Sequence, residues 1–426
     1  MSGVVITPPM TAQRAREIAA GFDLRSLPPD FYSNPFPVYA ALRETEPVRR
    51  MPDGSWFLTR HADLVAVYRD AHAFSSDKKV EFTPKYGAGS ALLEHHTGSL
   101  VFNDPPLHTR VRKLIMGALT RRAIAAMEPG LVTLVDGLLD AIEARGGGDL
   151  VEDFASAIPV EIIGNLLGVP HADRGPLRGW SLAILGALEP KLTPQQEALG
   201  NSSVSAFLDY LRSLVAERRR RPGDPEHDVL TRLIQGEAAG ETLGETELLQ
   251  NCIFILNAGH ETTTNLIGNA LVALQEWPQQ KDALLHAIGP RPDWTALEPM
   301  LTIAVDEFLR FESSNQLGNR RALRACEVGG VPLPEGALVT LCIGAANRDP
   351  AQFTDPDVLD LARADNRHLA FGFGIHQCAG LSLARLEGRI AIGRFLARFP
   401  RYRLTAAPTR GGRARFRGFL HAPFKV

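Results

Sequence analysis

A ten-residue stretch near the C-terminal end holds the side chains best suited to chemistry. It reads Phe371-Gly372-Phe-Gly-Ile-His376-Gln-Cys378-Ala-Gly380 and directly precedes a segment with helical spacing. Its glycines allow the backbone to turn tightly and approach a flat ligand. A thiol at a helix N-terminus faces unpaired N–H groups and the positive end of the helix dipole, so we expect a lowered pKa for Cys378. A thiolate in this position is a suitable axial ligand for haem iron, where it favours O–O cleavage.

A second polar group interrupts an apolar helical segment at residues 257–263, which read Asn-Ala-Gly-His-Glu-Thr-Thr. The small Ala258 and Gly259 would leave space for O₂ and substrate over a porphyrin, and the polar break predicts a locally opened helix. Glu261 and Thr262 supply an acid and a hydroxyl, which with ordered water make a proton relay. The alternative for such a threonine is a hydroxyl bond within the helix.

Haem also carries two propionates, and buried carboxylates need cationic or hydrogen-bonding partners. His108 and Arg112 are four residues apart in a segment begun by prolines, so they share one face of a predicted helix. Glu307 and Arg310 are three residues apart and can form a charge-assisted pair on one helix face.

In combination these motifs resemble the haem-thiolate monooxygenases called cytochromes P-450, particularly their soluble bacterial members. Residues 371–380 match every fixed position of the family signature Phe-Gly-x-Gly-x-His-x-Cys-x-Gly. The resemblance covers nearly the whole chain and implies a mainly α fold with small β-sheets, in which haem b lies between a long central helix and the cysteine loop. It implies that Cys378 is the proximal iron ligand. The haem-binding residues it implies are His108, Arg112, Ala258, Gly259, Arg320, Phe371, Gly372, His376, Cys378 and Gly380.

The same resemblance gives roles to residues that mean little alone. Glu307-Phe-Leu-Arg310 is similar to the family's Glu-x-x-Arg, which implies a buried ion pair with Arg363 as a third, structural partner. Arg320, or its neighbour Arg321, resembles a further propionate ligand.

Hydrophobic periodicity predicts the elements that must position these residues. A capping signal, Thr242-Leu-Gly-Glu245, opens a helix that continues to Trp277, where Pro278 stops it; a helix of this length would span about 50 Å and cross the molecule. Residues 77–103 contain Pro and Gly and predict a long, mobile functional loop. The other expected helices are 32–43, 110–118, 123–144, 159–167, 178–188, 203–219, 301–311 and 379–399, the expected strands are 56–59, 328–331 and 337–342, and 348–367 is expected to be irregular.

Composition excludes several classes of function. The 426 residues include 46 Lys and Arg against 48 Asp and Glu, which argues against charge-driven binding to nucleic acid or to an anionic membrane. The sequence shows neither a secretory signal nor a run of about 20 apolar residues, so we expect a cytoplasmic protein without a membrane span. Four cysteines without a CxxC pair predict no disulfide framework. We expect residues 1–20 to be a flexible leader, residues 21–426 to form one haem-binding domain, and the protein to be a monomer.

The resulting hypothesis is a monooxygenase that takes electrons from NAD(P)H. Since the sequence has no flavin or iron–sulfur motif, it implies a ferredoxin and a separate reductase. Basic Arg112, Lys113, Arg121 and Arg122 would meet the acidic carrier. Two alternatives stay open: a peroxide-dependent enzyme, isomerase or dehydratase on the same haem scaffold, and a haem-based sensor or ligand-binding protein.

The substrate is expected to be a medium-sized, largely hydrophobic organic molecule with a polar handle. The candidate substrate contacts are Asn257, Asn315, Gln316 and Phe419, although an amide pair at 315–316 could equally satisfy loop backbone. His95-His96 is expected to be a surface pair without a ligand role. The basic segment 401–417 is expected to be a solvated strand and turn.

Overall fold

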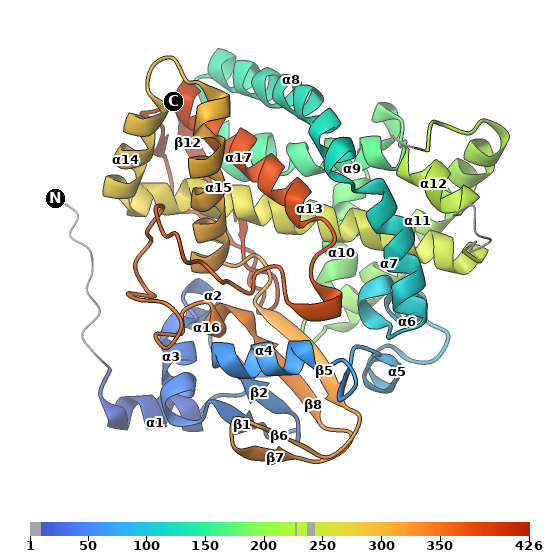
Figure 1. Cartoon of the computed structure of the whole chain (residues 1–426), viewed down its shortest axis with the longest axis vertical. Coiled ribbons are helices and arrows are strands. Elements are labelled where there is room, and N and C mark those ends of the chain that lie inside the picture. Colours follow the sequence, from blue (N-terminus) through green and yellow to red (C-terminus); the bar gives the residue numbers. More distant parts are fainter. Residues whose placement is uncertain (1–9, 226–227, 237–242) are drawn as a thin grey trace.

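The longest helix, α13 (Glu245–Glu276), runs across the molecule and is surrounded by the other helices (Figure 1). The computed structural model describes residues 10–225, 228–236 and 243–426. The Gly244 N–H donates to the Glu247 side chain at 2.9 Å and satisfies one free donor at the start of the helix. Pro278 follows the C-cap residue Trp277, as the sequence predicts. Thr242, the expected cap, lies outside the described residues.

The structure is mainly helical with small sheets, as predicted (Figure 1). The other α-helices are α1 (Ala12–Ala20), α2 (Pro29–Ser33), α3 (Phe36–Thr45), α4 (His61–Arg69), α5 (Lys79–Tyr86), α6 (Ala91–Gly98), α7 (Leu107–Ala118), α8 (Arg121–Arg145), α9 (Ala157–Leu166), α10 (Leu177–Gly186), α11 (Pro194–Arg220), α12 (Val229–Gln235), α14 (Pro278–Ile288), α15 (Trp294–Phe311), α16 (Ile343–Ala346) and α17 (Leu381–Arg398). Short 3₁₀-helices are η1 (Leu100–Phe102), η3 (His171–Asp173) and η4 (Gly374–His376), and η2 (Leu150–Ala155) is a π-helix.

The largest sheet has the strand order β1-β2-β8-β5-β3 and lies at one end of the molecule (Figure 1). The pair β2–β8 is parallel, and the other neighbours are antiparallel. Its strands are β1 (Val48–Arg50), β2 (Trp56–Leu58), β3 (Phe74–Ser75), β5 (Leu317–Ala322) and β8 (Leu338–Cys342). The smaller sheets are formed by β4 (Gly147–Asp149), β12 (Pro423–Lys425) and β9 (Arg403–Leu404), by β6 (Cys326–Val328) and β7 (Val331–Leu333), and by β10 (Thr409–Arg410) and β11 (Phe419–His421).

The main core forms where α13 packs against α9, α10 and α17. Close contact between α17 and its neighbours depends on Gly388, because a Cβ there would lie 3.1 Å from Leu266 and 3.3 Å from Val305. This packing holds α17, and the cysteine loop before it, in a fixed place beside the central helix. In the described part of the chain, no helix is both long and apolar enough to cross a membrane.

Part of the expected leader is ordered. Residues 12–20 form α1, which packs on α3 with Ala15 and Ala19 buried. The Thr11 side chain accepts a hydrogen bond from the Arg14 N–H at 3.2 Å and caps this helix. The rest of the expected leader, residues 1–9, lies outside the described residues.

The prediction of an unstructured loop over residues 77–103 is wrong. Most of it is helical, in α5, α6 and η1, and its glycines separate these elements: Gly87 and Gly89 have φ of 77° and 75°. His95 and His96 are not at the surface but buried in α6, where His95 Nδ1 lies 3.0 Å from Gln250 Oε1 of α13. Burial lowers the pKa of His95 to about 4. The polar pair is therefore part of the core because a helix partner and aromatic neighbours surround it.

The second half of the basic segment 401–417 also differs from its prediction. Arg401 and Arg403 are exposed, but Arg417 is buried and Arg410 partly so. Arg410 pairs with Glu312 at 3.0 Å, and Arg417 contacts the same carboxylate. A charged side chain is buried here because the tertiary fold supplies an opposite charge from a distant segment.

Candidate active site

The cysteine loop is built to place Cys378 directly before α17. The Cys378 N–H donates to the Phe371 carbonyl at 2.9 Å, which closes the loop on itself. Gly372 and Gly374 have φ of 65° and 73°, and a Cβ on Gly374 would lie 2.3 Å from the Tyr68 carbonyl. Only glycine allows the loop to approach α4 this closely.

The pKa of the Cys378 thiol is raised, which corrects the prediction of a lowered value. Burial disfavours the thiolate most strongly, whereas a hydrogen bond from the Gly380 N–H and the charge of Arg112 favour it. As a whole residue Cys378 is partly exposed, unlike the buried Cys252 and Cys342. A bound metal ion deprotonates a thiol outright, so burial does not prevent Cys378 from acting as a thiolate ligand.

Four cationic or potentially cationic groups lie together beside this loop: His108, Arg112, Arg320 and His376. The rings of His108 and His376 are 4.0 Å apart, and the Nε2 atoms of both are buried without a partner in the described residues. Burial, followed by the charges of Arg320, His108 and Arg112, lowers the pKa of His376 to about 2. Such a cluster of donors and positive charges needs an anionic partner. It fits the two propionates of haem, which would pair with these donors.

One face of α13 is left uncovered by protein. Ile255, Ala258 and Thr262 are partly or fully exposed at helical spacing, although Asn257 and His260 between them are buried. An exposed alanine at the centre of the longest helix indicates a place for a flat, apolar group. The residues present therefore fit a haem bound by the cysteine loop and bordered by α13.

The predicted opening of α13 is wrong. The helix is continuous through residues 257–265, and the Thr262 hydroxyl donates to the Ala258 carbonyl at 2.6 Å. This is the intrahelical alternative, which uses the hydroxyl within its own helix turn. Gly259 serves packing, since a Cβ there would lie 2.5 Å from Ile163 of α9. Of the two small residues, only Ala258 faces open space.

Glu261 is a buried carboxylate at 1% exposure, and its pKa is raised. Burial is the main cause; Glu189 also raises it, whereas Arg413 and Asn265 lower it. The Arg413 guanidinium pairs with the Glu261 carboxylate, a partner that the sequence did not suggest. The sequence hint of such a partner is the alternation of arginines at 413, 415 and 417 beside a glycine turn. That pattern is equally typical of a solvated strand.

The Glu307–Arg310–Arg363 cluster forms as expected in geometry. Arg310 donates to both Glu307 oxygens at 2.7 and 2.8 Å, and Arg363 Nε donates to one of them at 3.1 Å. Arg310 also donates to the carbonyls of Asn347 and Pro356. These bonds tie α15 to the irregular segment that leads into the cysteine loop.

The candidate substrate contacts divide into two kinds. Asn257 is buried with neither amide atom paired among the described residues, so it retains hydrogen-bonding capacity. Gln316 Nε2 instead donates to the Ser313 carbonyl at 2.6 Å, and Asn315 Oδ1 accepts from the Leu317 N–H at 3.4 Å. Both amides therefore bond to loop backbone, the alternative left open by the sequence, although Gln316 Oε1 is buried without a partner among the described residues. Phe419 lies in β11, and the Arg410 guanidinium carbon lies 4.1 Å from the centre of the Phe419 ring.

The basic residues proposed to meet an electron carrier lie on two consecutive helices. Lys113 on α7 and Arg121 and Arg122 on α8 are exposed. Arg112 is partly buried, and its charge lowers the pKa of Cys378. We therefore assign Arg112 to the candidate haem site and not to the carrier surface.

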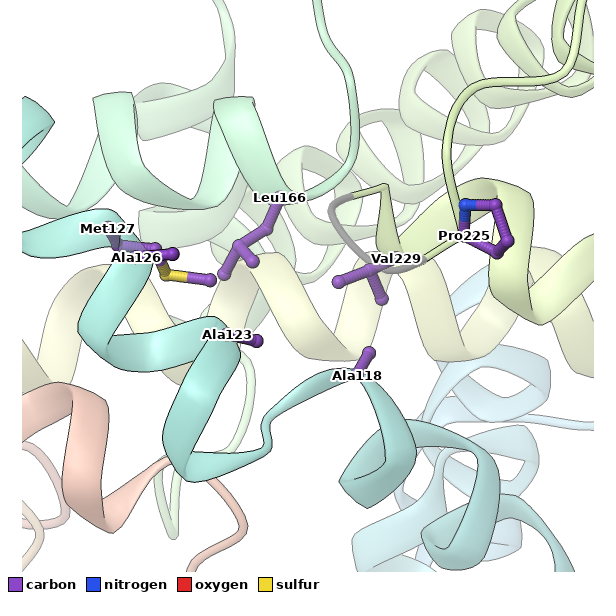
Figure 2. Close-up of a pocket in the computed structure, with 7 residues that line it drawn as sticks. All are labelled: Ala118, Ala123, Ala126, Met127, Leu166, Pro225 and Val229. Carbon is purple, nitrogen blue, oxygen red and sulfur yellow. The ribbon is translucent and has the colours of Figure 1, made fainter.

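A separate hollow of about 160 Å³ lies between α7, α8, α9 and α12 (Figure 2). Figure 2 shows the side chains of Met127, Leu166, Val229 and Ala118 directed toward one another. Its lining residues are Ala118, Ala123, Ala126, Met127, Leu166, Pro225 and Val229. None of these side chains carries a charge that could pair with a propionate, and none of the candidate haem-binding residues lines this hollow.

Comparison with known proteins agrees with this geometry. A family model described as Cytochrome P450 matches residues 183–406. Cytochrome P450 107B1 of Saccharopolyspora erythraea is 37% identical over 383 residues, which is 87% of this chain and 89% of that protein. Epothilone C/D epoxidase of Sorangium cellulosum is 35% identical over 96% of each chain. The structure of P450BioI in complex with hexadec-9Z-enoic acid ligated acyl carrier protein matches with a TM-score of 0.85 and 32% identity, over 93% of this chain and 100% of that chain.

A mainly helical fold that presents a cysteine beside a cluster of cationic groups, together with these matches, indicates a haem-thiolate enzyme. The chain belongs to the cytochrome P450 family. It is a monooxygenase of that family, with haem b as its cofactor.

Proposed function

We propose that this protein inserts one atom of O₂ into a medium-sized, largely hydrophobic organic substrate, with electrons from NAD(P)H delivered through a ferredoxin reductase and a ferredoxin. The observation that carries the proposal is Cys378, a partly exposed residue before α17 and beside the unpaired donors of His108 and His376. The likeness to an epoxidase and to a structure that contains a hexadecenoyl group supports an apolar substrate.

The chain's own residues have distinct tasks in this mechanism. Haem, when bound through Cys378, supplies the thiolate-ligated iron that activates O₂. His108, Arg112, Arg320 and His376 bind the propionates and fix the orientation of the ring. Glu261 holds and releases a proton in the middle of α13, and the Thr262 hydroxyl, one residue along, donates to the Ala258 carbonyl and can accept a hydrogen bond at the uncovered face. Asn257 binds a polar group of the substrate through its unpaired amide.

The thiolate ligand is tested by Cys378→Ser, with Cys326→Ser as a matched control because Cys326 is also a free, partly exposed cysteine. We expect the wild type and the control, reduced under carbon monoxide, to give the strongly red-shifted absorbance maximum of a haem-thiolate. Cys378→Ser should lose it. The same maximum in Cys378→Ser would contradict the proposal.

Substrate-dependent NAD(P)H oxidation with reconstituted ferredoxin and reductase separates the remaining possibilities. A monooxygenase consumes NAD(P)H and O₂ together with product formation. A peroxide-dependent enzyme forms product from peroxide without the partners, and an isomerase or dehydratase forms product without consuming either. A sensor forms no product.

The carrier surface is tested by charge reversal of exposed Arg121 and Arg122. Because attraction to an acidic ferredoxin accelerates association, reversal should slow first-electron transfer by about tenfold at low salt and flatten its salt dependence. Reversal of Arg16, an exposed arginine on α1, serves as the control. Unchanged reduction rates in the α8 variants would place the docking surface elsewhere.

A further inference from the structure

The C-terminal segment 413–417 lies over α13 and is held in place by several bonds to other elements. The backbone N–H groups of Ala414 and Arg415 donate to the Glu189 carboxylate at 2.8 and 3.1 Å. Gln316 N–H donates to the Arg415 carbonyl at 2.7 Å, and Arg417 N–H donates to the Ser314 carbonyl at 2.8 Å. The segment is therefore positioned independently of Arg413, which lies at its start.

Arginines alternate along this segment and have different partners. The Arg415 guanidinium donates to the Leu317 carbonyl at 2.7 Å, and Arg417 contacts Glu312. Arg413 alone of the three pairs with Glu261, the acid of the predicted proton relay. Its side chain is 16% exposed and that of Glu261 is 2% exposed, so the pair is largely shielded from water. Attraction between opposite charges is strong in such surroundings.

We propose that Arg413 is a positioning residue for Glu261: its charge favours the ionised carboxylate and fixes it against the C-terminal segment, and thereby controls how readily this acid takes up a proton. The inference rests on the proposed function and adds a residue to it. Burial alone would keep Glu261 protonated, since a buried carboxylate without a partner favours its neutral form. Glu189, from the loop after α10, also raises the pKa of Glu261, whereas Asn265 on α13 lowers it. Arg413 is the cation that opposes both.

A catalytic acid must be able to change its protonation state. The Glu261–Arg413 pair leaves this possible because Arg413 pairs with Oε1 of Glu261, whereas Oε2 is buried without a hydrogen-bond partner among the described residues and can take up a proton. The pair is therefore not a saturated network, and proton uptake by Glu261 requires only one ion pair to be given up.

The test measures the protonation of Glu261 directly, in the ferric, substrate-free holoenzyme. Infrared spectra between pH 5 and 9 follow the C=O stretch of a protonated carboxyl, and the Glu261 band is assigned by its absence in Glu261→Gln. In Arg413→Met the midpoint of this band should move up by at least about one pH unit, a tenfold change in proton affinity, because the stabilising cation is gone. Arg413→Lys retains the charge and should restore most of the shift.

Arg410→Met is the matched control, because Arg410 lies three residues before this segment and pairs with Glu312. It should leave the Glu261 midpoint in place. An unchanged midpoint in Arg413→Met, or an equal shift in Arg410→Met, would overturn the proposal. The infrared midpoint is independent of turnover, and the carbon monoxide spectrum reports separately on the haem-thiolate, so failure of the two proposals can be distinguished.

Should Arg413→Met fail to fold, the double variant Arg413→Met/Glu261→Gln decides the question. If an unpaired buried carboxylate causes the failure, removal of its charge should restore folding and haem binding. A double variant that also fails to fold would show that Arg413 acts independently of Glu261, which contradicts the proposal.

Discussion

Glu307 and Glu261 are both carboxylates buried among helices, yet their surroundings differ. Glu307 accepts hydrogen bonds from Arg310, Arg363, Asn366 Nδ2 at 3.1 Å and the Asp360 N–H at 2.9 Å. Glu261 has one ion-pair partner. A carboxylate whose lone pairs are all occupied ties the elements around it together, whereas one with a single ion-pair partner keeps an oxygen that can take up a proton. The first arrangement suits a framework and the second suits catalysis.

The largest effect on stability should come from Glu307→Gln. It leaves Arg310 and Arg363 buried without their neutralising charge, which should lower the free energy of unfolding by about 3–5 kcal/mol. Urea denaturation of the holoenzyme measures this. Asp209→Asn removes one partner of the exposed Asp209–Arg212 pair and should cost less than about 1 kcal/mol. Equal losses in both variants would refute the framework role of Glu307.

The next largest effect should be on catalysis, from Glu261→Gln. Glutamine keeps the shape of the side chain but cannot release a proton, so product formation per NAD(P)H consumed should fall by about 100-fold, equivalent to about 2.7 kcal/mol. The loss in unfolding free energy should be clearly smaller than for Glu307→Gln. If catalysis survives while stability collapses, the contrast between the two glutamates is reversed.

A smaller effect concerns His260, the neighbour of Glu261 on α13. Burial, followed by the charge of Arg178, lowers the pKa of His260 to about 3, so this histidine is neutral in the folded protein at pH values where the unfolded chain becomes protonated. Its contribution to stability is complete above about pH 6.5 and is lost as the pH falls toward 3, with a slope of about 1.4 kcal/mol per pH unit.

Urea denaturation at pH 6.5, 5.5 and 4.5 tests this linkage. His260→Gln should remove that part of the slope. An undiminished slope in His260→Gln would show that other groups cause the acid sensitivity.

Much of the architecture could be predicted because its signals are local. The central helix follows from uninterrupted apolar spacing that ends before Pro278, and α17 follows in the same way after the cysteine loop. The Glu307–Arg310 pair follows from spacing on one helix face. Residues 77–103 were misread because Pro and Gly break periodicity equally in a loop and between two short helices, and tertiary contacts such as that of His95 with Gln250 decided between them.

The candidate site was only partly predictable. The sequence shows which residue types stand in the cysteine loop, in α7 and in α13. It does not show that Gly259 faces α9, because that depends on where Ile163 lies in the fold. Arg413 was missed for the same reason: its partner is 152 residues away, and nothing in the local pattern distinguishes a solvated arginine from a buried one.

The sequence by itself determined the helical class, the cysteine that can bind haem iron, and the acid and hydroxyl in the central helix, because each depends on residue types at fixed short spacing. Only the tertiary structure decided which charges are paired, which small residue faces open space, and whether Cys378 and Glu261 are buried. Burial and long-range pairing depend on segments that meet only after folding, and they set the electrostatic free energy of every ionisable group at the site.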